Sequence, residues 1–430
     1  MEYWWKQAKI YELYIDKFAT DLKGLASQMP YFEALGINCL HLLPHYPSPM
    51  VDDGYDISDY RNVRPELGTI EDFGAMIREA HSRGIRIITD LVLNHTSDQH
   101  PWFIEARASK DNPKRHFYIW SETGTEFPLS LPAMPDVNDS IWSPNEQTND
   151  FYYTKFYAQQ PDLNWDNDEV FEEMFSVIKF WADLGVDGFR LDAAPHLIKR
   201  EGTNCRSLPE THAVLKRLRA RLEAEYPQVI FLAEAHESIE DTKKFFGSGD
   251  ECHMAYHFNL MEQMWVALQK GEMLKVQEMV DASHDIPDNC AWAIFLRNHD
   301  EISLTTIEPG IRSALVAFLD PDGLFHFKKR EGDAASVRIG SVFRGDRDGM
   351  RRAFKLLYSL PGSPIMYYGD EIGMSNLPHE EGIQDSRKYV RGQFDWSLAE
   401  AQMADPTSLW HEVATLIKGM PETPQDNVTA

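Results

Sequence analysis

The sequence predicts an α/β protein whose main body is a closed barrel of eight parallel strands, with helices on its outside. Eight short apolar runs alternate with amphipathic stretches along most of the chain. Strict alternation of this kind favours a closed (β/α)8 barrel over an open doubly wound sheet. One connection, after the third run, is much longer than the others and predicts a small inserted domain. The length of 430 residues alone would also suit two or three ordinary domains.

Each strand is predicted from a run of aliphatic, β-branched or aromatic residues bounded by turn-forming residues. The eight runs occupy residues 10–15, 37–42, 85–90, 188–192, 230–234, 254–258, 293–296 and 365–367. Helices are predicted where apolar residues recur every three to four positions after first-turn signals such as Glu71, Asp72 and Pro209. The clearest helical patterns lie at 70–83, 170–184, 209–226 and 350–359.

The long connection between the third and fourth strands is predicted to be the insertion. Residues 100–166 are rich in Pro, Asn, Asp and aromatic residues and show no clear helical period. A connection of that length in a compact domain is usually functional or a small subdomain, so we expect it to stand over the barrel mouth. The predicted organisation is a first barrel part at 1–98, the insertion at 99–166, a second barrel part at 167–400, and a C-terminal helix and tail at 401–430.

The C-terminal part carries one more helical pattern, at 408–418, before a polar end at 420–430 that is expected to fray. No complete C-terminal β-domain is expected. The four cysteines, Cys39, Cys205, Cys252 and Cys290, form no close-spaced pair and no zinc pattern. The N-terminus lacks a secretion signal, and no apolar stretch is long enough to span a bilayer. We therefore expect a cytoplasmic chain with reduced thiols.

The charge balance narrows the classes of partner. Lys and Arg number 42 against 68 Asp and Glu, a net charge of -26, which disfavours nucleic acid and anionic membrane surfaces. A small neutral substrate fits better. The sequence does not indicate an oligomeric state. Aromatic residues make up 12% of the chain; this suits stacking on sugar rings, although aromatic residues are more often part of the core.

Polar residues collect at the predicted carboxyl ends of four strands, where barrels of this kind place their active sites. They are Asp90, Asn94, His95, Arg190, Asp192, Glu234, Asn298, His299 and Asp300. Each alone is as readily a solvated loop residue, but agreement among four strand ends is hard to attribute to chance. A metal site is the competing interpretation, and no His-x-x-x-His or comparable ligand spacing supports it.

Paired carboxylates at one mouth suit acid/base and nucleophilic work on a bond to a sugar, with the two groups about 5 Å apart in a retaining mechanism. Asp192 suits the nucleophile, because Arg190 points to the same strand face and favours its ionised form. A purely structural Arg–Asp pair is the alternative. Glu234 follows an apolar strand, which together with nearby like charges would raise its pKa and suit it as acid/base. Asp300 would stabilise the positive transition state.

Four motifs, in this order, resemble the signature regions of the α-amylase superfamily, glycoside hydrolase family 13. They are DLVLNH (90–95), GFRLDAAPH (188–196), FLAEA (231–235) and FLRNHD (295–300). QPDLNW (160–165) resembles an additional region near the end of that family's inserted domain. The resemblance implies a catalytic barrel with a domain inserted after strand three. It also implies an α-retaining mechanism with Asp192 as nucleophile, Glu234 as acid/base and Asp300 as transition-state stabiliser.

Other residues gain expected roles in substrate binding. His95 and His299 are plausible hydroxyl ligands. By the same resemblance, DDGYDISDY (52–60) is similar to the segment that closes the pocket of α-glucosidase-type members around the non-reducing glucose. Tyr55 would stack on the ring, and Asp52 would bind hydroxyls together with Arg387. A plain Asp-Gly turn is the alternative for this segment. A pocket closed in this way favours short substrates.

Further stretches resemble trehalose synthases, which isomerise maltose and trehalose; they are residues 200–212, 249–258, 287–301 and 359–374. Three departures are visible, one of which is the expected absence of a C-terminal β-domain. The insertion is short, and DSRKYVRGQFDW (385–396) is more similar to the sucrose-acting amylosucrases. Isomerisation needs a closed site that retains free glucose. The acidic calcium loop of many α-glucosidases is missing at residues 16–21, and Asn94 is the one candidate left for a structural calcium, which we do not predict.

The leading hypothesis is a retaining α-glucosidase or α-transglucosylase that acts on small α-glucosides such as maltose, trehalose or sucrose-like sugars, without an organic cofactor. The alternative is a trehalose synthase that transfers glucose intramolecularly. A third, from another class, is a non-catalytic sugar-binding protein; it is disfavoured because all three carboxylates are present. Linkage preference and acceptor stay open.

Overall fold

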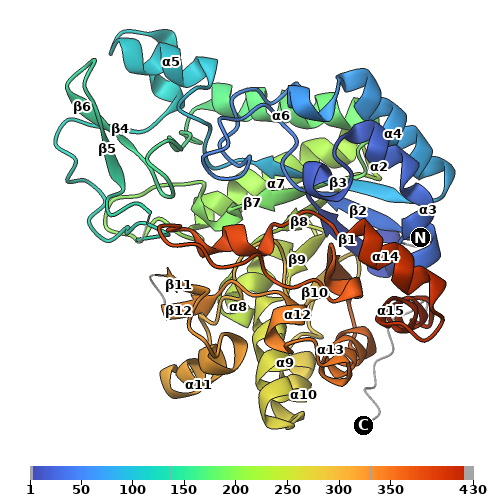
Figure 1. Ribbon diagram of the computed structural model, residues 1–430. Coiled ribbons are helices and arrows are strands. Elements are labelled where there is room, and N and C mark those ends of the chain that lie inside the picture. The colour runs from blue at the N-terminus through green and yellow to red at the C-terminus, as the bar shows by residue number, and fades with distance from the viewer. Residues whose placement is uncertain (1–2, 136, 330–331, 421–430) are drawn as a thin grey trace.

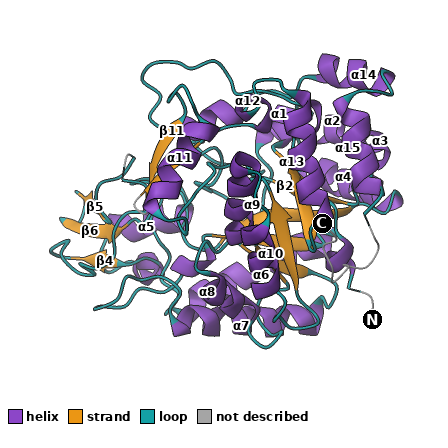
Figure 2. Ribbon diagram, turned by 90° about the horizontal axis from the view of Figure 1, so that it is seen from below, coloured by secondary structure: helices purple, strands orange, loops and turns teal. Residues whose placement is uncertain are grey.

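The chain folds as a closed barrel of parallel strands surrounded by helices, as Figures 1 and 2 show for a computed structural model that describes residues 3–135, 137–329 and 332–420. The strands lie in the order β1-β13-β10-β9-β8-β7-β3-β2. Their bounds are β1 Ile10–Leu13, β2 Cys39–Leu42, β3 Arg86–Val92, β7 Gly188–Asp192, β8 Ile230–Ala233, β9 Met254–Tyr256, β10 Ala291–Phe295 and β13 Ser363–Tyr367. The predicted fold class is confirmed, and each predicted strand is found within a few residues of its expected position.

The barrel is closed by β1 and β13, where Ile10 pairs with Ile365. The first strand ends two residues earlier than predicted, because Ile15 begins the short helix α1 instead of continuing the strand. Between β3 and β8, β7 passes so close to its neighbours that a Cβ on Gly188 would lie 2.6 Å from the side chain of Ile230. Glycine at this position therefore lets β7 fit into the sheet.

The helices form the outer layer of the barrel (Figure 2). They are α1 Ile15–Phe18, α2 Leu22–Ser27, α3 Met29–Leu35, α4 Ile70–Ser82, α6 Asp168–Leu184, α7 Pro209–Glu225, α8 Ile239–Lys243, α9 Phe258–Lys270, α10 Leu274–Ala282, α11 Pro309–Leu319, α12 Ile339–Val342, α13 Arg347–Ser359, α14 Trp396–Ala404 and α15 Leu409–Lys418. All five predicted helical patterns are present. The helix α14 was not predicted. The polar end at 421–430 lies outside the described residues.

Two of the helices show why their ends were predictable. At the start of α4, Thr69 and Asp72 form a reciprocal capping box. At the end of α6, Gly185 takes a left-handed conformation with φ of 105°. Among the described residues, no helix has the length and apolar character needed to cross a membrane. All four cysteines are buried and unpaired.

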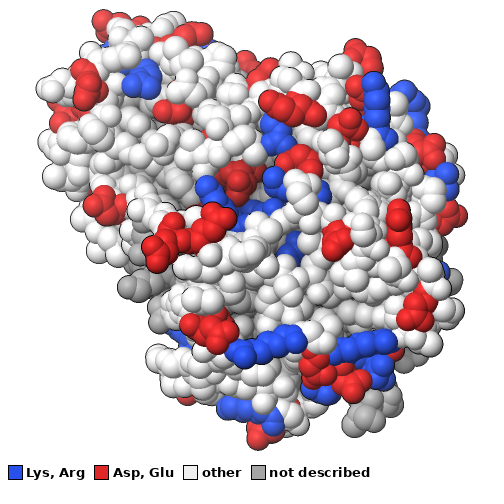
Figure 3. All heavy atoms as spheres, viewed as in Figure 1, with Lys and Arg blue, Asp and Glu red and all other residues white. Residues whose placement is uncertain are grey.

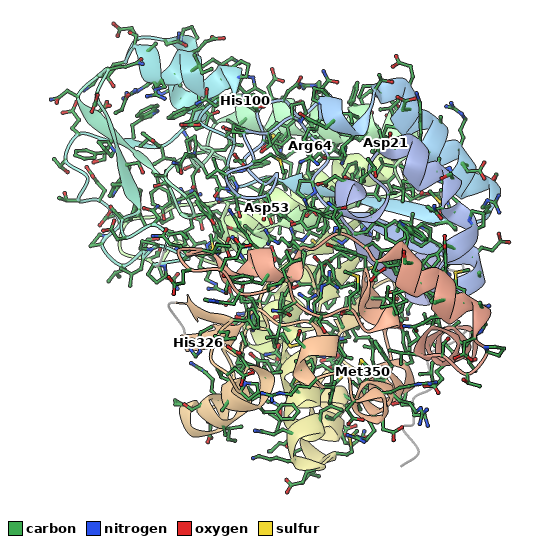
Figure 4. All side chains as sticks on the ribbon, in the orientation of Figure 1. Asp21, Asp53, Arg64, His100, His326 and Met350 are labelled. Carbon is green, nitrogen blue, oxygen red and sulfur yellow. The ribbon has the colours of Figure 1, made fainter. Side chains whose placement is uncertain are left out.

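The segment between β3 and α6 projects from the barrel, at the upper left of Figure 1. It holds the helix α5 (Pro101–Ala108) and an antiparallel sheet of β4 (Trp120–Ser121), β6 (Asp150–Tyr153) and β5 (Trp142–Asn145). His100, which is labelled in Figure 4, caps α5 by accepting a hydrogen bond from the backbone of Trp102. A small core of Ile141, Trp142 and Tyr153 holds the sheet together. This structure was not predicted beyond its position.

A second unpredicted feature is the hairpin of β11 (His326–Lys329) and β12 (Gly332–Ala335), which lies between α11 and α12 in the chain. Figure 1 shows it on the same side of the barrel as the insertion. Ala334 of the hairpin packs with Met134 and Tyr157 of the insertion. The insertion and the hairpin therefore meet, although about 160 residues of sequence lie between them.

Candidate active site

The predicted residues meet at the carboxyl ends of the barrel strands. Asp192 is the last residue of β7, Glu234 directly follows β8, and Asp300 lies shortly after β10. All three line one cavity that is open to solvent. Five further predicted residues line the same cavity: Asp52, Tyr55, His95, Asn298 and Arg387. Arg190 and His299 are fully buried in contact with these residues and do not line it.

Arg190 joins the carboxylates beneath the cavity. Its Nη1 lies 2.6 Å from Asp90 Oδ1 and 2.6 Å from Asp192 Oδ1, and its Nη2 lies 2.7 Å from Glu234 Oε1. One guanidinium thus contacts three carboxylates from three neighbouring strands. Because Asp192 and Glu234 share it, they are held close enough to act on one bond.

Asp192 is almost enclosed, with 8% of the residue exposed. Burial raises the pKa of its carboxyl group, and the negative charges of Glu234 and Asp90 add to this shift, while Arg190 opposes it. The sequence predicted only the Arg190 contribution. The pair of Asp192 and Arg190 is therefore not an isolated ion pair but part of a shared charge network.

Glu234 has more polar surroundings than its apolar strand predicts. Besides Arg190, its Oε2 accepts a hydrogen bond of 3.0 Å from the backbone N–H of Ala193. Ala193 adopts a left-handed backbone with φ of 49°, which is uncommon for a residue with a side chain. This local conformation directs its N–H at Glu234. The strained residue lies directly between the nucleophile candidate and the first turn after β7.

Asp300 is surrounded by positive groups. His299 Nε2 lies 3.2 Å from Oδ2, while Arg391 and Arg387 lie 2.8 and 3.3 Å from Oδ1. Burial alone would raise the pKa of Asp300, but His299, Arg387 and Arg391 hold it well below its usual range. Asp300 is therefore ionised at neutral pH, as stabilisation of a positive transition state would require.

Asp52 and Arg387 form the predicted pair at one end of the cavity, 2.9 Å apart. Gln160 donates to the other oxygen of Asp52 at 3.0 Å, and Asp385 binds Arg387 through both of its oxygens. Tyr55 lies beside this pair with its ring stacked on His299 at 5.4 Å between centroids. The arrangement closes this end of the cavity with side chains that carry fixed charges.

Sequence reasoning missed Arg391, which is buried and bonds Asp300, the backbone oxygen of His299 and Asp53. Figure 4 shows Asp53 near the centre of the view, where Figure 3 shows acidic and basic atoms side by side. The signal was present: Arg391 lies four residues after Arg387 in the same segment. Two arginines four residues apart, Arg387 and Arg391, therefore both contact the carboxylate of Asp300.

His95 lines the cavity in its neutral form. Burial lowers the pKa of its imidazole to about 4. Its Nε2 is buried and has no hydrogen-bond partner among the described residues. A neutral ring nitrogen without a partner at a cavity wall suits a substrate hydroxyl. His299, by contrast, is 1% exposed and contacts other side chains instead of the cavity.

Asn94, the candidate for calcium, binds a lysine. Lys199 Nζ lies 3.0 Å from Asn94 Oδ1, 2.7 Å from Asp162 Oδ2 and 2.7 Å from the backbone oxygen of His196. An ammonium group thus occupies the centre of this oxygen cluster and provides the positive charge there. Among the described residues, no group of three His, Cys, Asp or Glu side chains is arranged to hold a metal ion.

The outer part of the cavity has two different walls. One is the insertion, with residues 131–134, Lys155 and Phe156. The other carries His236, whose ring stacks on Phe258 at 4.3 Å and whose Nε2 lies 2.6 Å from Thr305 Oγ1. A mixed aromatic and polar wall next to the carboxylates suits a second sugar or another hydroxyl compound.

A parallel barrel with three carboxylates around a sugar-sized cavity defines the class of carbohydrate-active barrel proteins. Comparison with known proteins agrees. Residues 13–316 match the family model described as alpha amylase, catalytic domain. The chain belongs to the α-amylase family, as its motifs predicted.

Similar proteins with known names add detail to this family assignment. The trehalose synthase/amylase TreS of Mycolicibacterium smegmatis is 44% identical over 385 residues, which is 87% of this chain and 64% of that protein. A trehalose synthase of Pimelobacter sp. is 38% identical over 400 residues, covering 89% and 69% of the two chains. The chain thus spans less than two thirds of the mycobacterial relative's length. Among solved structures, the trehalulose synthase MutB from Pseudomonas mesoacidophila matches with a TM-score of 0.77 at 26% identity, covering 96% of this chain and 83% of that one.

Proposed function

We propose that the protein is a retaining α-glucosidase or α-transglucosylase that acts on small α-glucosides through a covalent glucosyl-enzyme. The observation that carries the proposal is the convergence of Asp192, Glu234 and Asp300 on one cavity. Asp192 and Glu234 touch the same guanidinium. This favours the separation of about 5 Å used by retaining enzymes over the roughly 6.5–9.5 Å of inverting ones.

In the first step, Asp192 attacks the anomeric carbon while the bond to the leaving oxygen breaks and Glu234 donates its proton to that oxygen. In the second, Glu234 takes a proton from an acceptor hydroxyl, whose oxygen displaces Asp192 from the anomeric carbon. Asp300, ionised by its neighbouring cations, lowers the energy of the oxocarbenium-like transition states. Both steps balance with groups of the chain and its substrates, so the proposed mechanism requires no organic cofactor.

The closed end of the cavity supports an exo-acting site for the non-reducing glucose. Asp52, Arg387 and His95 offer hydrogen bonds to hydroxyls, and Tyr55 offers a ring beside them. A substrate that enters glucose first places its second residue against the wall of His236 and Phe258. The proposed substrates are therefore short neutral sugars, which also suits the net charge of -26.

A second candidate is a trehalose synthase that isomerises maltose and trehalose. It is favoured by the 44% identity to a trehalose synthase and by the contact between insertion and hairpin through Met134 and Ala334. Met134 also lines the cavity, so this contact supports part of its outer wall. Retention of glucose until it reorients is what separates isomerisation from hydrolysis.

The deciding experiment is product analysis. The purified chain is incubated with maltose, trehalose, sucrose and p-nitrophenyl α-glucoside, and the products are resolved by chromatography. Free glucose or longer α-glucosides as main products support the leading proposal. Trehalose formed from maltose with little free glucose replaces it with the isomerase. Sugar binding without turnover would indicate a non-catalytic protein and defeat both.

A further inference from the structure

A layer of charged side chains lies inside the barrel beneath the cavity. Glu12 on β1, His41 on β2 and Asp90 on β3 are fully buried, and His299 after β10 is 1% exposed. None of these four lines the cavity. Burial of charged groups without water is costly unless each is paired, so their mutual contacts explain how the barrel tolerates them.

Glu12 is the centre of this layer. Its Oε1 accepts from the backbone N–H of His299 at 2.7 Å and lies 3.0 Å from His299 Nδ1. Its Oε2 lies 3.1 Å from His41 Nδ1 and accepts from the hydroxyl of Tyr256 at 3.2 Å. Both oxygens are therefore fully engaged, and both imidazoles turn the same nitrogen toward one carboxylate.

The other nitrogen of each histidine faces a further carboxylate, which is Asp300 for His299 and Asp90 for His41. His299 Nε2 lies 3.2 Å from Asp300 Oδ2 and 2.7 Å from the hydroxyl of Tyr55. His41 Nε2 lies 3.1 Å from Asp90 Oδ2, the carboxylate that shares Arg190 with Asp192. Carboxylates on both sides of an imidazole favour the form in which both nitrogens carry a proton.

We infer that Glu12 is a positioning residue that holds His299 as an imidazolium, whose Nε2–H faces both Asp300 Oδ2 and the hydroxyl of Tyr55. Glu12 touches no part of the cavity and acts through His299. Its carboxylate orients the residue by one bond to the ring Nδ1 and one to the backbone N–H, and it supplies the negative charge that keeps Nδ1 protonated. The link to catalysis rests on the proposed function of Asp300, whereas the link between Glu12 and His299 does not.

The groups around His299 explain why the pKa of its imidazole is raised. Burial would lower the pKa of His299, but Asp300 and Glu12 together raise it to about 9. Tyr55 stacks on the ring, Tyr14 meets it edge-on, and Arg391 bonds its backbone oxygen. The negative charge of Asp90 lies close enough for the two groups to interact. Removal of the Glu12 charge must therefore lower the pKa of His299.

The test is Glu12→Gln, which keeps the size and one carbonyl acceptor but removes the charge. Histidine side chains are followed by NMR in labelled protein, with His299→Asn to assign the signal. The midpoint of the His299 titration gives the pKa of its imidazole. We expect this pKa to fall from about 9 by about one pH unit or more in Glu12→Gln. Glu371→Gln is the matched control. It removes another buried carboxylate, bonded to Tyr11 and Tyr31, and should leave the midpoint unchanged.

An unchanged His299 midpoint in folded Glu12→Gln overturns the inference. If that variant does not fold, the wild type decides: a midpoint near the ordinary 6.5 would equally overturn it. The alkaline limb of kcat/KM on p-nitrophenyl α-glucoside then tests the link to catalysis, and it should move to lower pH in Glu12→Gln. A wild type without activity on any α-glucoside would defeat the proposed function and leave the NMR result valid.

Discussion

At the scale of single residues, Arg190 and His41 share the neutralisation of the carboxylates below the cavity. Arg190 contacts the carboxyl groups of Asp90, Asp192 and Glu234, and one positive charge cannot balance Asp90 and Asp192 together when both are ionised. His41 lies 3.1 Å from Asp90. Burial opposes protonation of His41, but Asp90 and Glu12 raise its pKa. With Asp90 paired in this way, more of the Arg190 charge is available to Asp192 and Glu234.

Asp192→Asn tests the proposed nucleophile. The amide keeps the shape and one oxygen for Arg190 but does not attack the anomeric carbon, so kcat should fall by about 10⁴-fold or more. The free energy of unfolding should not fall, because a buried carboxyl group close to Glu234 and Asp90 is replaced by a neutral group. Glucose release and thermal unfolding measure the two effects.

The matched control for that variant is Asp183→Asn, a substitution of an exposed carboxylate on α6, which should leave both quantities unchanged. Wild-type turnover in Asp192→Asn would remove the nucleophile assignment. A variant that is inactive because it is unfolded would be recognised by its lost thermal transition.

Sequence position was enough to predict which residues meet at the mouth, because the carboxyl ends of parallel strands converge. It did not predict their surroundings. Glu234 follows an apolar strand, yet Arg190 and the backbone of Ala193 reach it from β7 and the turn after it. His299 was expected at a sugar hydroxyl and lies one layer deeper, on Glu12. Such contacts depend on side-chain packing between elements, which has no periodic signature in the sequence.

At the scale of elements, the insertion is attached to the barrel by Lys199. The lysine follows β7 in the chain, and its ammonium binds Asn94 after β3 and Asp162 at the end of the insertion. It is 6% exposed. Three segments that are separate in sequence therefore meet at one buried cation, which fixes the base of the insertion beside the cavity.

Lys199→Met tests this attachment. The variant leaves Asp162 as a buried charge without its cation, so the free energy of unfolding should fall by about 3–5 kcal/mol. Thermal unfolding measures the loss, and limited proteolysis should show earlier cleavage within the insertion. Lys216→Met, which replaces an exposed lysine on α7, is the control.

Because Lys199 fills the oxygen cluster, EDTA should not lower the Tm of the wild type. A clear decrease in Tm would contradict the assignment of this cluster to Lys199.

The regular elements were predictable and the insertion was not, for a physical reason. Barrel strands and outer helices bury one continuous face, so their apolar residues repeat with a fixed period. In the insertion, β4 has two residues and β5 four, too few for a pattern. The hairpin of β11 and β12 likewise consists of four-residue strands. Short strands of this kind are defined by their partners and not by their own sequence.

At the scale of the whole molecule, the cavity is a product of parts that lie far apart in the chain. Its closed end uses Asp52 and Arg387, and its outer wall uses the insertion. The insertion and the hairpin meet through Met134, Tyr157 and Ala334. The balance between hydrolysis and transfer should therefore depend on a contact that involves none of the three central carboxylates.

Met134→Ser tests that dependence. The smaller polar side chain weakens the packing with Tyr157 and Ala334, so water should enter and glucose leave more readily. We expect the ratio of free glucose to transfer or isomerisation product to rise several-fold, while the free energy of unfolding falls by about 2–3 kcal/mol. Product ratios are measured at equal conversion. Met273→Ser, an exposed methionine before α10, serves as control.

The pairing of β1 with β13, which closes the barrel, has a consequence for biosynthesis. Ile10 of β1 is paired in register with Ile365 of β13, so this edge of β1 stays unpaired until about 355 further residues have left the ribosome. Contacts of such large sequence separation form slowly, and exposed strand edges attract other chains. Nascent chains stalled before residue 363 should therefore be far more prone to aggregate than the finished protein.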